Sequence, residues 1–162
     1  MSKKNGHLRY LRLSTPRLLL GLLMLGTTVI PASAIAQTTA TSTRANEQRV
    51  WMTVGQRRFS IILADNETSR AFAARLPLSL DMPDLNSNEK HVTLAHKLPT
   101  QPYRPGVIHN GDLMLYGSST LVLFYLTFDS PYSYTRIGRV EDVDDLARVL
   151  GRHSVRVVFS AQ

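Results

Sequence analysis

Four tyrosines and one arginine in the C-terminal half of the chain have side chains that suit ligand binding: Tyr116, Tyr125, Tyr132, Tyr134 and Arg136. A tyrosine combines an apolar ring with a polar hydroxyl, so a cluster of tyrosines can both stack on a ligand and hydrogen-bond to it. A guanidinium group can bind a carboxylate through two parallel hydrogen bonds. The alternative is that the rings pack in the core and rim of the fold, with their hydroxyls bonded to backbone. We predict a ligand site at Tyr116, Tyr125, Tyr134 and Arg136.

A polar loop at residues 86–89 could add to this site. Asn86, Asn88 and Glu89 could hydrogen-bond to a ligand, or could bind a cation through their oxygens. A dedicated calcium loop would carry acids at alternate positions and a glycine turn, and this loop does not. The alternative is a solvated turn whose asparagines bond to their own backbone. We include Asn86 and Glu89 among the predicted ligand-binding residues and expect no metal.

Several kinds of chemistry lack the residues that they need. The chain has no cysteine, so it has neither disulfides nor a redox pair. His91 and His96 are five residues apart and do not form the His-Glu-x-x-His pattern of zinc enzymes. Ser118 and Ser119 lack the glycines of a nucleophile elbow, and no phosphate-binding glycine loop is present. We therefore expect no cofactor.

The N-terminal 36 residues have the layout of a cleavable Sec-type signal peptide. Five basic residues precede an apolar run at 18–25, and small residues follow Pro31. Cleavage after Ala34 or Ala36 fits the spacing, and Ala36 is preferred because a polar segment follows it. The apolar run is shorter than the roughly 20 residues that a membrane span needs. We predict a periplasmic or secreted protein with no stable membrane anchor after cleavage.

The basic charge of the chain comes mostly from this segment. The whole chain has 19 basic and 12 acidic residues, a net charge of +7. Five of the basic residues and none of the acids lie in residues 1–36, which leaves 14 basic against 12 acidic residues in the mature chain. A net charge of +2 gives little support to nucleic-acid binding, and we expect no nucleic-acid partner.

The remaining chain divides into a polar tether at 37–48 and one domain at 49–162. Apolar residues alternate with polar ones in most of the apolar stretches of the domain, a pattern typical of strands. Gly55-Gln56 suits a two-residue hairpin loop between the first two strands. Two helices are expected, one capped by Asp65 or Asn66 and one ending at Gly151. Strands are expected near 50–54, 59–63, 78–82, 91–94, 113–116, 120–128, 134–140 and 155–159. This pattern favours a barrel or two packed sheets, with the first and last strands paired.

The domain resembles the bacterial cyclophilin-like proteins. The matching segments are LPLSLDM at 76–82, NSNEK at 86–90, GDLMLYG at 111–117, LVLFY at 121–125 and YSYTRIG at 132–138. The resemblance implies a mostly β fold, a closed cyclophilin-like β-barrel of about eight strands with two short capping helices.

The signature of the catalytic cyclophilins is incomplete in this chain. Those enzymes carry Phe-His-Arg followed by Gln-Gly-Gly-Asp, and use the arginine to weaken the X–Pro amide. In the nearest stretch, 103–112, Arg104 could stand for the arginine and Asn110 for the glutamine, but the Phe-His pair and one glycine are absent. We therefore predict a non-catalytic module that binds a small molecule or a peptide segment. The alternative is a peptidyl-prolyl isomerase that acts on exported proteins through Arg104 and Asn110. A third interpretation, from fold analogy alone, is an accessory domain of a redox or carboxylase system.

Overall fold

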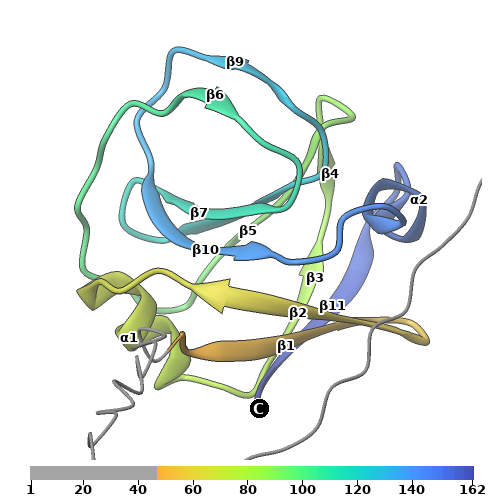
Figure 1. The fold of residues 1–162 in the computed structure, drawn as a ribbon, viewed down its shortest axis with the longest axis horizontal. Helices are drawn as coiled ribbons and strands as arrows, with labels where there is room; N and C mark the ends of the chain where they lie inside the picture. Colours follow the sequence, from red (N-terminus) through yellow and green to blue (C-terminus); the bar gives the residue numbers. More distant parts are fainter. Residues whose placement is uncertain (1–46) are drawn as a thin grey trace, which may run out of the picture. The chain divides into compact units, whose positions relative to one another are not determined.

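A computed structural model describes residues 47–162 (Figure 1). The predicted signal peptide and nearly all of the predicted tether lie outside these residues. The strands are β1 (Arg49–Val54), β2 (Arg57–Leu63), β3 (Leu78–Met82), β4 (Asp84–Leu85), β5 (Glu89–Thr93), β6 (Gly106–Ile108), β7 (Asp112–Tyr116), β8 (Thr120–Phe124), β9 (Phe128–Ser130), β10 (Thr135–Val140) and β11 (Val155–Ala161). The helices are α1 (Glu67–Ala73) and α2 (Leu146–Leu150).

Nine of the strands form one antiparallel sheet that curls into a nearly closed barrel. Their order is β3-β11-β1-β2-β10-β7-β8-β5-β4. The two end strands, β3 and β4, follow each other in the chain with only Pro83 between them, so the ends of the sheet come together. The amide of His91 on β5 donates to the carbonyl of Pro83 at 3.2 Å, which extends the pairing of β5 with β4 to the residue that joins the two end strands. The mostly β barrel expected from the sequence is thus confirmed, with nine strands in place of about eight.

The first hairpin forms as its sequence pattern predicts. Val50, Met52 and Val54 are buried on β1, and the pairing of Val54 with Arg57 leaves Gly55-Gln56 as a two-residue loop. Gly55 has a φ of +56°, a value that glycine adopts without steric cost. β1 also pairs with β11, as expected for the first and last strands. The barrel closes elsewhere, however, because its seam lies between β3 and β4.

Helix α1 begins at Asn66, whose side chain caps it. The Asn66 Oδ1 accepts hydrogen bonds from the backbone N–H of Ser69 at 2.8 Å and from its hydroxyl at 2.9 Å. The Asn66 amide also donates to the carbonyl of Arg136 at 2.8 Å, which joins the start of the helix to β10. Helix α2 is a single short turn that ends at Gly151, as predicted. Both helices bury side chains in the main core, Phe72 from α1 and Leu146 from α2.

The segment of the sheet made by β10, β7, β8 and β5 is covered on both faces. One face carries Leu113, Leu121 and Leu123 into the main core. The other face carries Met114 and Val122 into a second, smaller core, which also holds residues from β6, β8 and β9 and Tyr134, the residue before β10. β6 and β9 pair with each other and lie over this second face (Figure 1). The expected single strand at 120–128 is therefore wrong, because β8 ends at Phe124 and β9 starts at Phe128 in a separate sheet. The polar loop expected at 86–89 is shorter than expected, since β4 ends at Leu85 and β5 begins at Glu89.

Candidate functional site

A cavity of about 320 Å³ opens on the second face of the sheet. We call it the tyrosine pocket, because three tyrosines form much of its wall. It is lined by Leu85, Asn86, Asn88, Glu89, His91, Tyr116, Thr120, Val122, Phe128, Asp129, Ser130, Pro131, Tyr132 and Tyr134. The cavity therefore lies between strands of the barrel, the β4–β5 turn and the segment that follows β9.

Strand register brings the floor of the pocket together. Glu89 pairs with Phe124, and His91 pairs with Val122, across β5 and β8. On the other side of β8, Thr120 pairs with Tyr116 of β7. Directly paired residues of antiparallel strands point to the same face of a sheet. Three strands that are separate in the sequence therefore present their side chains to one cavity.

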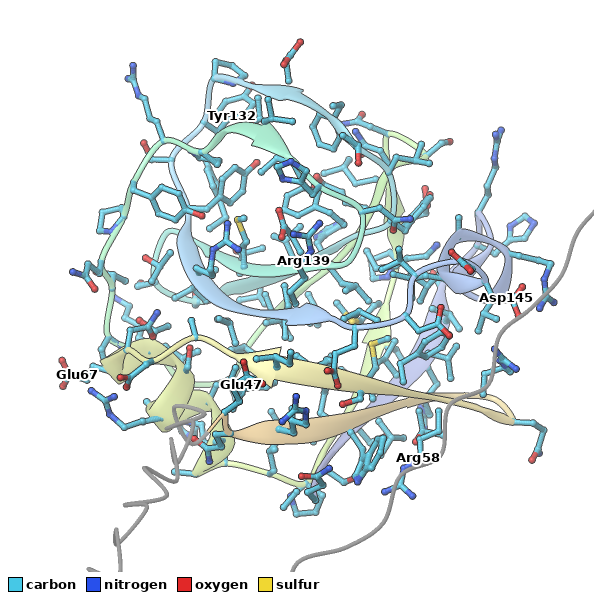
Figure 2. The ribbon with its side chains drawn as sticks, viewed as in Figure 1. Glu47, Arg58, Glu67, Tyr132, Arg139 and Asp145 are labelled. Carbon is cyan, nitrogen blue, oxygen red and sulfur yellow. The ribbon has the colours of Figure 1, made fainter. Side chains whose placement is uncertain are left out.

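The tyrosines of the pocket continue a chain of aromatic contacts that starts in the second core. The ring of Phe124 lies 5.4 Å from that of Tyr134, at an interplanar angle of 89°. Tyr134 lies 5.7 Å from Tyr116, which in turn lies 6.2 Å from Tyr132 at 85°. Exposure rises along this chain, since Tyr134 is 7% exposed, Tyr116 48% and Tyr132 57%. Figure 2 labels Tyr132 beside β6 and β9. The buried rings thus fix the orientation of the exposed ones.

The turn between β4 and β5 forms the polar rim of the pocket. Asn86 and Ser87 have φ values of 54° and 57°, and the Ser87 N–H donates to Asp84 Oδ1 at 3.1 Å. The carbonyl of Asn88 accepts the N–H of Tyr125 at 3.0 Å. The side-chain Oδ1 of Asn88 is shielded from solvent and has no hydrogen-bond partner. The rim therefore carries one acceptor that the protein leaves unused.

A buried ion pair supports this turn from the main-core side. Lys90 is fully buried, and its Nζ donates to Asp84 Oδ2 at 3.1 Å and to the carbonyl of His153 at 2.7 Å. The hydroxyl of Tyr125 donates to the same Asp84 oxygen at 2.5 Å. Because side chains alternate along a strand, Glu89 and His91 face the pocket while Lys90 faces the opposite side. Strand β5 therefore contributes both to the ion pair behind the turn and to the wall of the pocket.

Burial and charge shift the pKa values of the groups around the turn. Burial, together with the nearby charge of Asp84, raises the pKa of Glu89. Burial also raises the pKa of Tyr134. Burial alone would raise the pKa of Asp84, but the hydrogen bonds from Tyr125 and Lys90 outweigh it and lower that pKa. Burial, followed by the hydrogen bond to Asp84, raises the pKa of Tyr125 well above its ordinary value of 10.0.

The raised pKa of Tyr125 predicts a loss of stability at alkaline pH. A tyrosine that holds its proton more tightly in the folded state contributes stability below the unfolded pKa of about 10, and this contribution is lost as the pH rises further. We expect the free energy of unfolding to fall more steeply above about pH 10 in the parent than in Tyr125→Phe. Urea unfolding from about pH 8 to pH 11 measures the difference. Tyr132→Phe, at an exposed ring, serves as the control, and equal slopes in parent and Tyr125→Phe would contradict the prediction.

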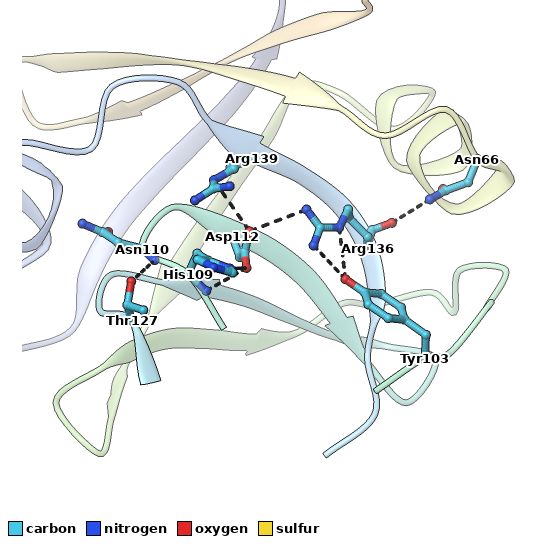
Figure 3. Close-up of polar contacts among 8 residues, drawn as sticks. All are labelled: Asn66, Tyr103, His109, Asn110, Asp112, Thr127, Arg136 and Arg139. Carbon is cyan, nitrogen blue, oxygen red and sulfur yellow. Dashed lines mark hydrogen bonds and ion pairs between the residues drawn. The ribbon is translucent and has the colours of Figure 1, made fainter. Parts of the chain in front are cut away.

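Arg136 lies in a separate cluster around Asp112 (Figure 3). Asp112 is fully buried and accepts the N–H of His109 at 2.9 Å. Nη1 of Arg136 and Nε of Arg139 lie 3.8 Å and 3.9 Å from its other oxygen. Arg136 also donates twice to the hydroxyl of Tyr103, at 3.0 Å and 2.8 Å. The guanidinium of Arg136 is thus already held by partners within the protein.

The structure brings together four of the six predicted ligand-binding residues. Asn86, Glu89, Tyr116 and Tyr134 all line the tyrosine pocket. Tyr125 and Arg136 are not among its lining residues, since the first supports the β4–β5 turn from behind and the second belongs to the Asp112 cluster.

The two residues of the isomerase alternative do not share a cavity. Arg104 lines an open groove next to the tyrosine pocket, which shares Tyr116, Tyr132 and Tyr134 with it. Asn110 lines a different hollow, together with Arg139 and Glu141. These two side chains therefore do not converge on one site.

Sequence reasoning missed several residues of the pocket wall. His91 could have been found, because it lies two residues from Glu89 and must share its face of a strand. Phe128 and Asp129 could not, because their strand β9 was merged with β8 in the expected pattern. Within residues 47–162, no group of three or more His, Cys, Asp or Glu side chains is placed to hold a metal ion. In the same part of the chain, no helix is long and apolar enough to cross a membrane.

Comparisons with known proteins agree with this architecture. The profile of the cyclophilin-like family matches residues 52–160. The solution structure of a hypothetical protein from Archaeoglobus fulgidus is similar to the chain, with a TM-score of 0.56 and 19% sequence identity. The similarity covers 72% of this chain and 95% of the archaeal one. At that identity the likeness bears on the fold alone. No curated protein matches the sequence.

Proposed function

The chain belongs to the cyclophilin-like family, and on that premise we propose that its domain is a non-catalytic binding module. The ligand is a small molecule or a peptide segment that lies in the tyrosine pocket. Family membership does not by itself assign a function, because one fold hosts many functions. The argument therefore has to come from the pocket.

The observation that carries the proposal is the pocket itself. Its volume of about 320 Å³ lies at the lower end of the range of known ligand sites. Its wall combines exposed aromatic rings with a few polar groups, the composition typical of such sites. Tyr116 and Tyr132 expose large apolar surfaces side by side, and buried neighbours hold them in place. A ligand that covers these rings would bury apolar area without any rearrangement of the barrel.

The positions of Arg104 and Asn110 favour binding over prolyl isomerisation. An isomerase needs an arginine and an apolar cup that act on the same proline residue. Arg104 lies with the tyrosine rings in the neighbouring groove, but Asn110, the second residue of the isomerase alternative, lies in another hollow. None of the arginines that the structure describes lines the tyrosine pocket. The pocket thus lacks the group that would weaken an X–Pro amide.

We further propose that the module acts after export, in the periplasm or outside the cell. This part rests on the sequence of residues 1–36, with its basic start, apolar run and small residues before the cut. Export by the producing cells, into the periplasm or the medium, with a mature N-terminus found at residue 35 or 37, is the expected result. Full-length protein retained inside the cells would contradict it.

A thermal-shift screen of the purified protein tests the binding proposal. We expect at least one compound to raise Tm, and we expect Tyr132→Ala to weaken its binding about tenfold, the change that about 1.4 kcal/mol of lost contact produces. Leu126→Ala is the matched control, because Leu126 is 46% exposed and lines none of the three cavities described above. Its affinity should equal that of the parent.

A protease-coupled prolyl isomerisation assay on the same sample separates the two functions. We expect the rate to stay at its uncatalysed value. Acceleration that Arg104→Ala abolishes would replace the binding module with an isomerase. Ligands that bind Tyr132→Ala and Tyr116→Ala as well as the parent would place the binding site outside the tyrosine pocket.

A further inference from the structure

The charged side chains that line the tyrosine pocket are mostly acidic. Among residues 47–162, Glu89 and Asp129 lie in its wall and no lysine or arginine does, so that His91 is the only basic side chain there from this part of the chain. Lys90, next to Glu89 in sequence, points to the opposite face and is held by Asp84. The negative charge of Glu89 is therefore not neutralised by a lysine or arginine within the pocket.

The rings of the pocket also lack a cation of their own. Among residues 47–162, the cation–aromatic contacts involve other rings, namely Trp51 with Arg58, Phe59 with Arg57, Tyr103 with Arg136 and Tyr125 with Lys90. The faces of Tyr116, Tyr132 and Tyr134 have no such partner. The ring of Tyr116 stands at steep angles to the other two, 85° to Tyr132 and 53° to Tyr134. Aromatic faces in such an arrangement attract a positively charged group from more than one side.

Two polar features of the rim also favour a positively charged ligand that carries N–H groups. The Oδ1 of Asn88 is shielded from solvent, lies in a pocket-lining residue and has no hydrogen-bond partner. A buried acceptor without a donor is costly, so a ligand N–H would be stabilised there if a shift of the β4–β5 turn brought the two together. Glu89 is half-buried beside a second acid, Asp84, and both effects raise its pKa. A bound cation would relieve this repulsion and stabilise the carboxylate.

We propose that the tyrosine pocket binds an organic cation, with an ammonium group beside Glu89 and the tyrosine faces and an apolar body against Phe128 and Val122. This inference rests on the proposed binding function and names its ligand class. The ammonium could belong to a free amine or to a lysine side chain of a peptide. Both sources present the same chemistry to Glu89, Asn88 and the three rings.

A series of three phenyl ligands of nearly equal size, which differ in their charged or polar end, tests the charge requirement directly. Phenethylamine carries a positive charge, phenethyl alcohol is neutral, and phenylacetate is negative. Titration of the purified protein, followed by calorimetry or by amide NMR shifts, should give the tightest binding for phenethylamine. The neutral alcohol should bind at least about threefold more weakly, and phenylacetate should bind more weakly still.

Variants test whether the preference for the positively charged ligand comes from the pocket. Glu89→Gln should weaken phenethylamine binding about tenfold and should change the affinity for phenethyl alcohol by a much smaller factor. Glu67→Gln is the matched control, because Glu67 is exposed on α1 and far in sequence from the pocket.

A blocked peptide with one central lysine, compared with its acetyl-lysine form, distinguishes a peptide ligand from a free amine. Binding of the lysine peptide in competition with phenethylamine indicates a peptide ligand, and binding of the free amine alone indicates a small molecule.

The outcomes separate this inference from the proposed function. Equal affinity for the amine and the alcohol, or a preference for phenylacetate, would overturn the cation inference and leave the binding pocket in place. Binding of a neutral compound from the screen, lost in Tyr132→Ala and unaffected by phenethylamine, would do the same. If neither the three ligands nor any compound of the screen binds at the pocket, the proposed function fails as well. The ligand series does not depend on any variant, so a Glu89→Gln protein that fails to fold leaves the test intact.

Discussion

Replacement of Lys90 by methionine is expected to lower the free energy of unfolding by about 3–5 kcal/mol, because it leaves a nearly buried carboxylate without its cation. Lys90 is fully buried, and Asp84 has a side chain that is only 11% exposed. The Nζ of Lys90 bonds to both Asp84 and the carbonyl of His153. Methionine has a similar shape but cannot donate, so both acceptors lose a hydrogen bond. Urea unfolding at neutral pH measures the loss.

An exposed ion pair gives the matched control for this prediction. Arg156 bonds to Asp81 at 2.7 Å, but both side chains are about two-thirds exposed. Arg156→Met should therefore change the free energy of unfolding by less than about 1 kcal/mol. If Lys90→Met costs no more than Arg156→Met, the buried pair does not stabilise the β4–β5 turn.

The double variant Asp84→Leu/Lys90→Met adds a second check. A buried pair replaced by apolar side chains often costs little, so the double variant should be more stable than the sum of the two single changes implies. The Asp84 carboxylate, with its lowered pKa, contributes stability above an unfolded pKa of about 4, and this contribution is lost as the pH falls below it. Lys90→Met should reduce that acid sensitivity, since the hydrogen bond from Lys90 helps to lower the pKa of Asp84.

Local sequence patterns predicted those parts of the fold that depend on neighbouring residues. The alternation on β1 and β2 and the glycine at position 55 were sufficient for the first hairpin. The uninterrupted apolar run of β8 was sufficient for a strand that is covered on both faces. The capping residues Asp65 and Asn66 predicted where α1 begins, and Gly151 predicted where α2 ends. In each case the cause lies within a few residues of the effect.

Features that depend on distant contacts could not be predicted in the same way. Pro83 joins two strands that lie at opposite ends of the sheet order, and the barrel closes at this junction. Hydrophobic periodicity predicts single strands but not their order in a sheet. β6 has only three residues and follows a proline-rich connection, so it shows no alternation. Its partner β9 is equally short and closely follows the apolar strand β8 in the sequence, so the pattern predicted one strand that covers both.

The candidate site was partly predictable for the same reason. Glu89 and Tyr116 were found because their residue types suit ligand binding. Tyr125 was grouped with them by type, but the alternation along β8 sends Val122 and Phe124 to the second face and directs the neighbouring residues, Tyr125 included, to the other face. Arg136 lies on the strand next to the pocket strands, but Tyr103 comes from a distant loop and holds it outside the pocket wall. A role for these two residues in ligand binding stays a prediction.

Replacement of Phe72 by alanine is expected to cost about 3–5 kcal/mol of stability, the range measured for buried phenylalanines. Phe72 is fully buried, and its ring packs edge-on against Phe159 of β11 at 5.5 Å and 81°. It is the aromatic side chain that fixes α1 to the main core. Alanine leaves a cavity at the contact between helix and barrel, and urea unfolding reports the cost.

The same variant tests whether the scaffold and the site are independent. Phe72 belongs to the main core, while the tyrosine pocket is built on the second core, across the same strands. In the folded fraction at low temperature, Phe72→Ala should therefore bind the pocket ligand with parental affinity. Phe128→Ala should do the opposite, because Phe128 is only partly buried but lines the pocket. It should cost less stability than Phe72→Ala and weaken binding. A loss of affinity in folded Phe72→Ala would mean that packing in one core sets the geometry of the other, so that the pocket depends on the whole barrel and not only on its second face.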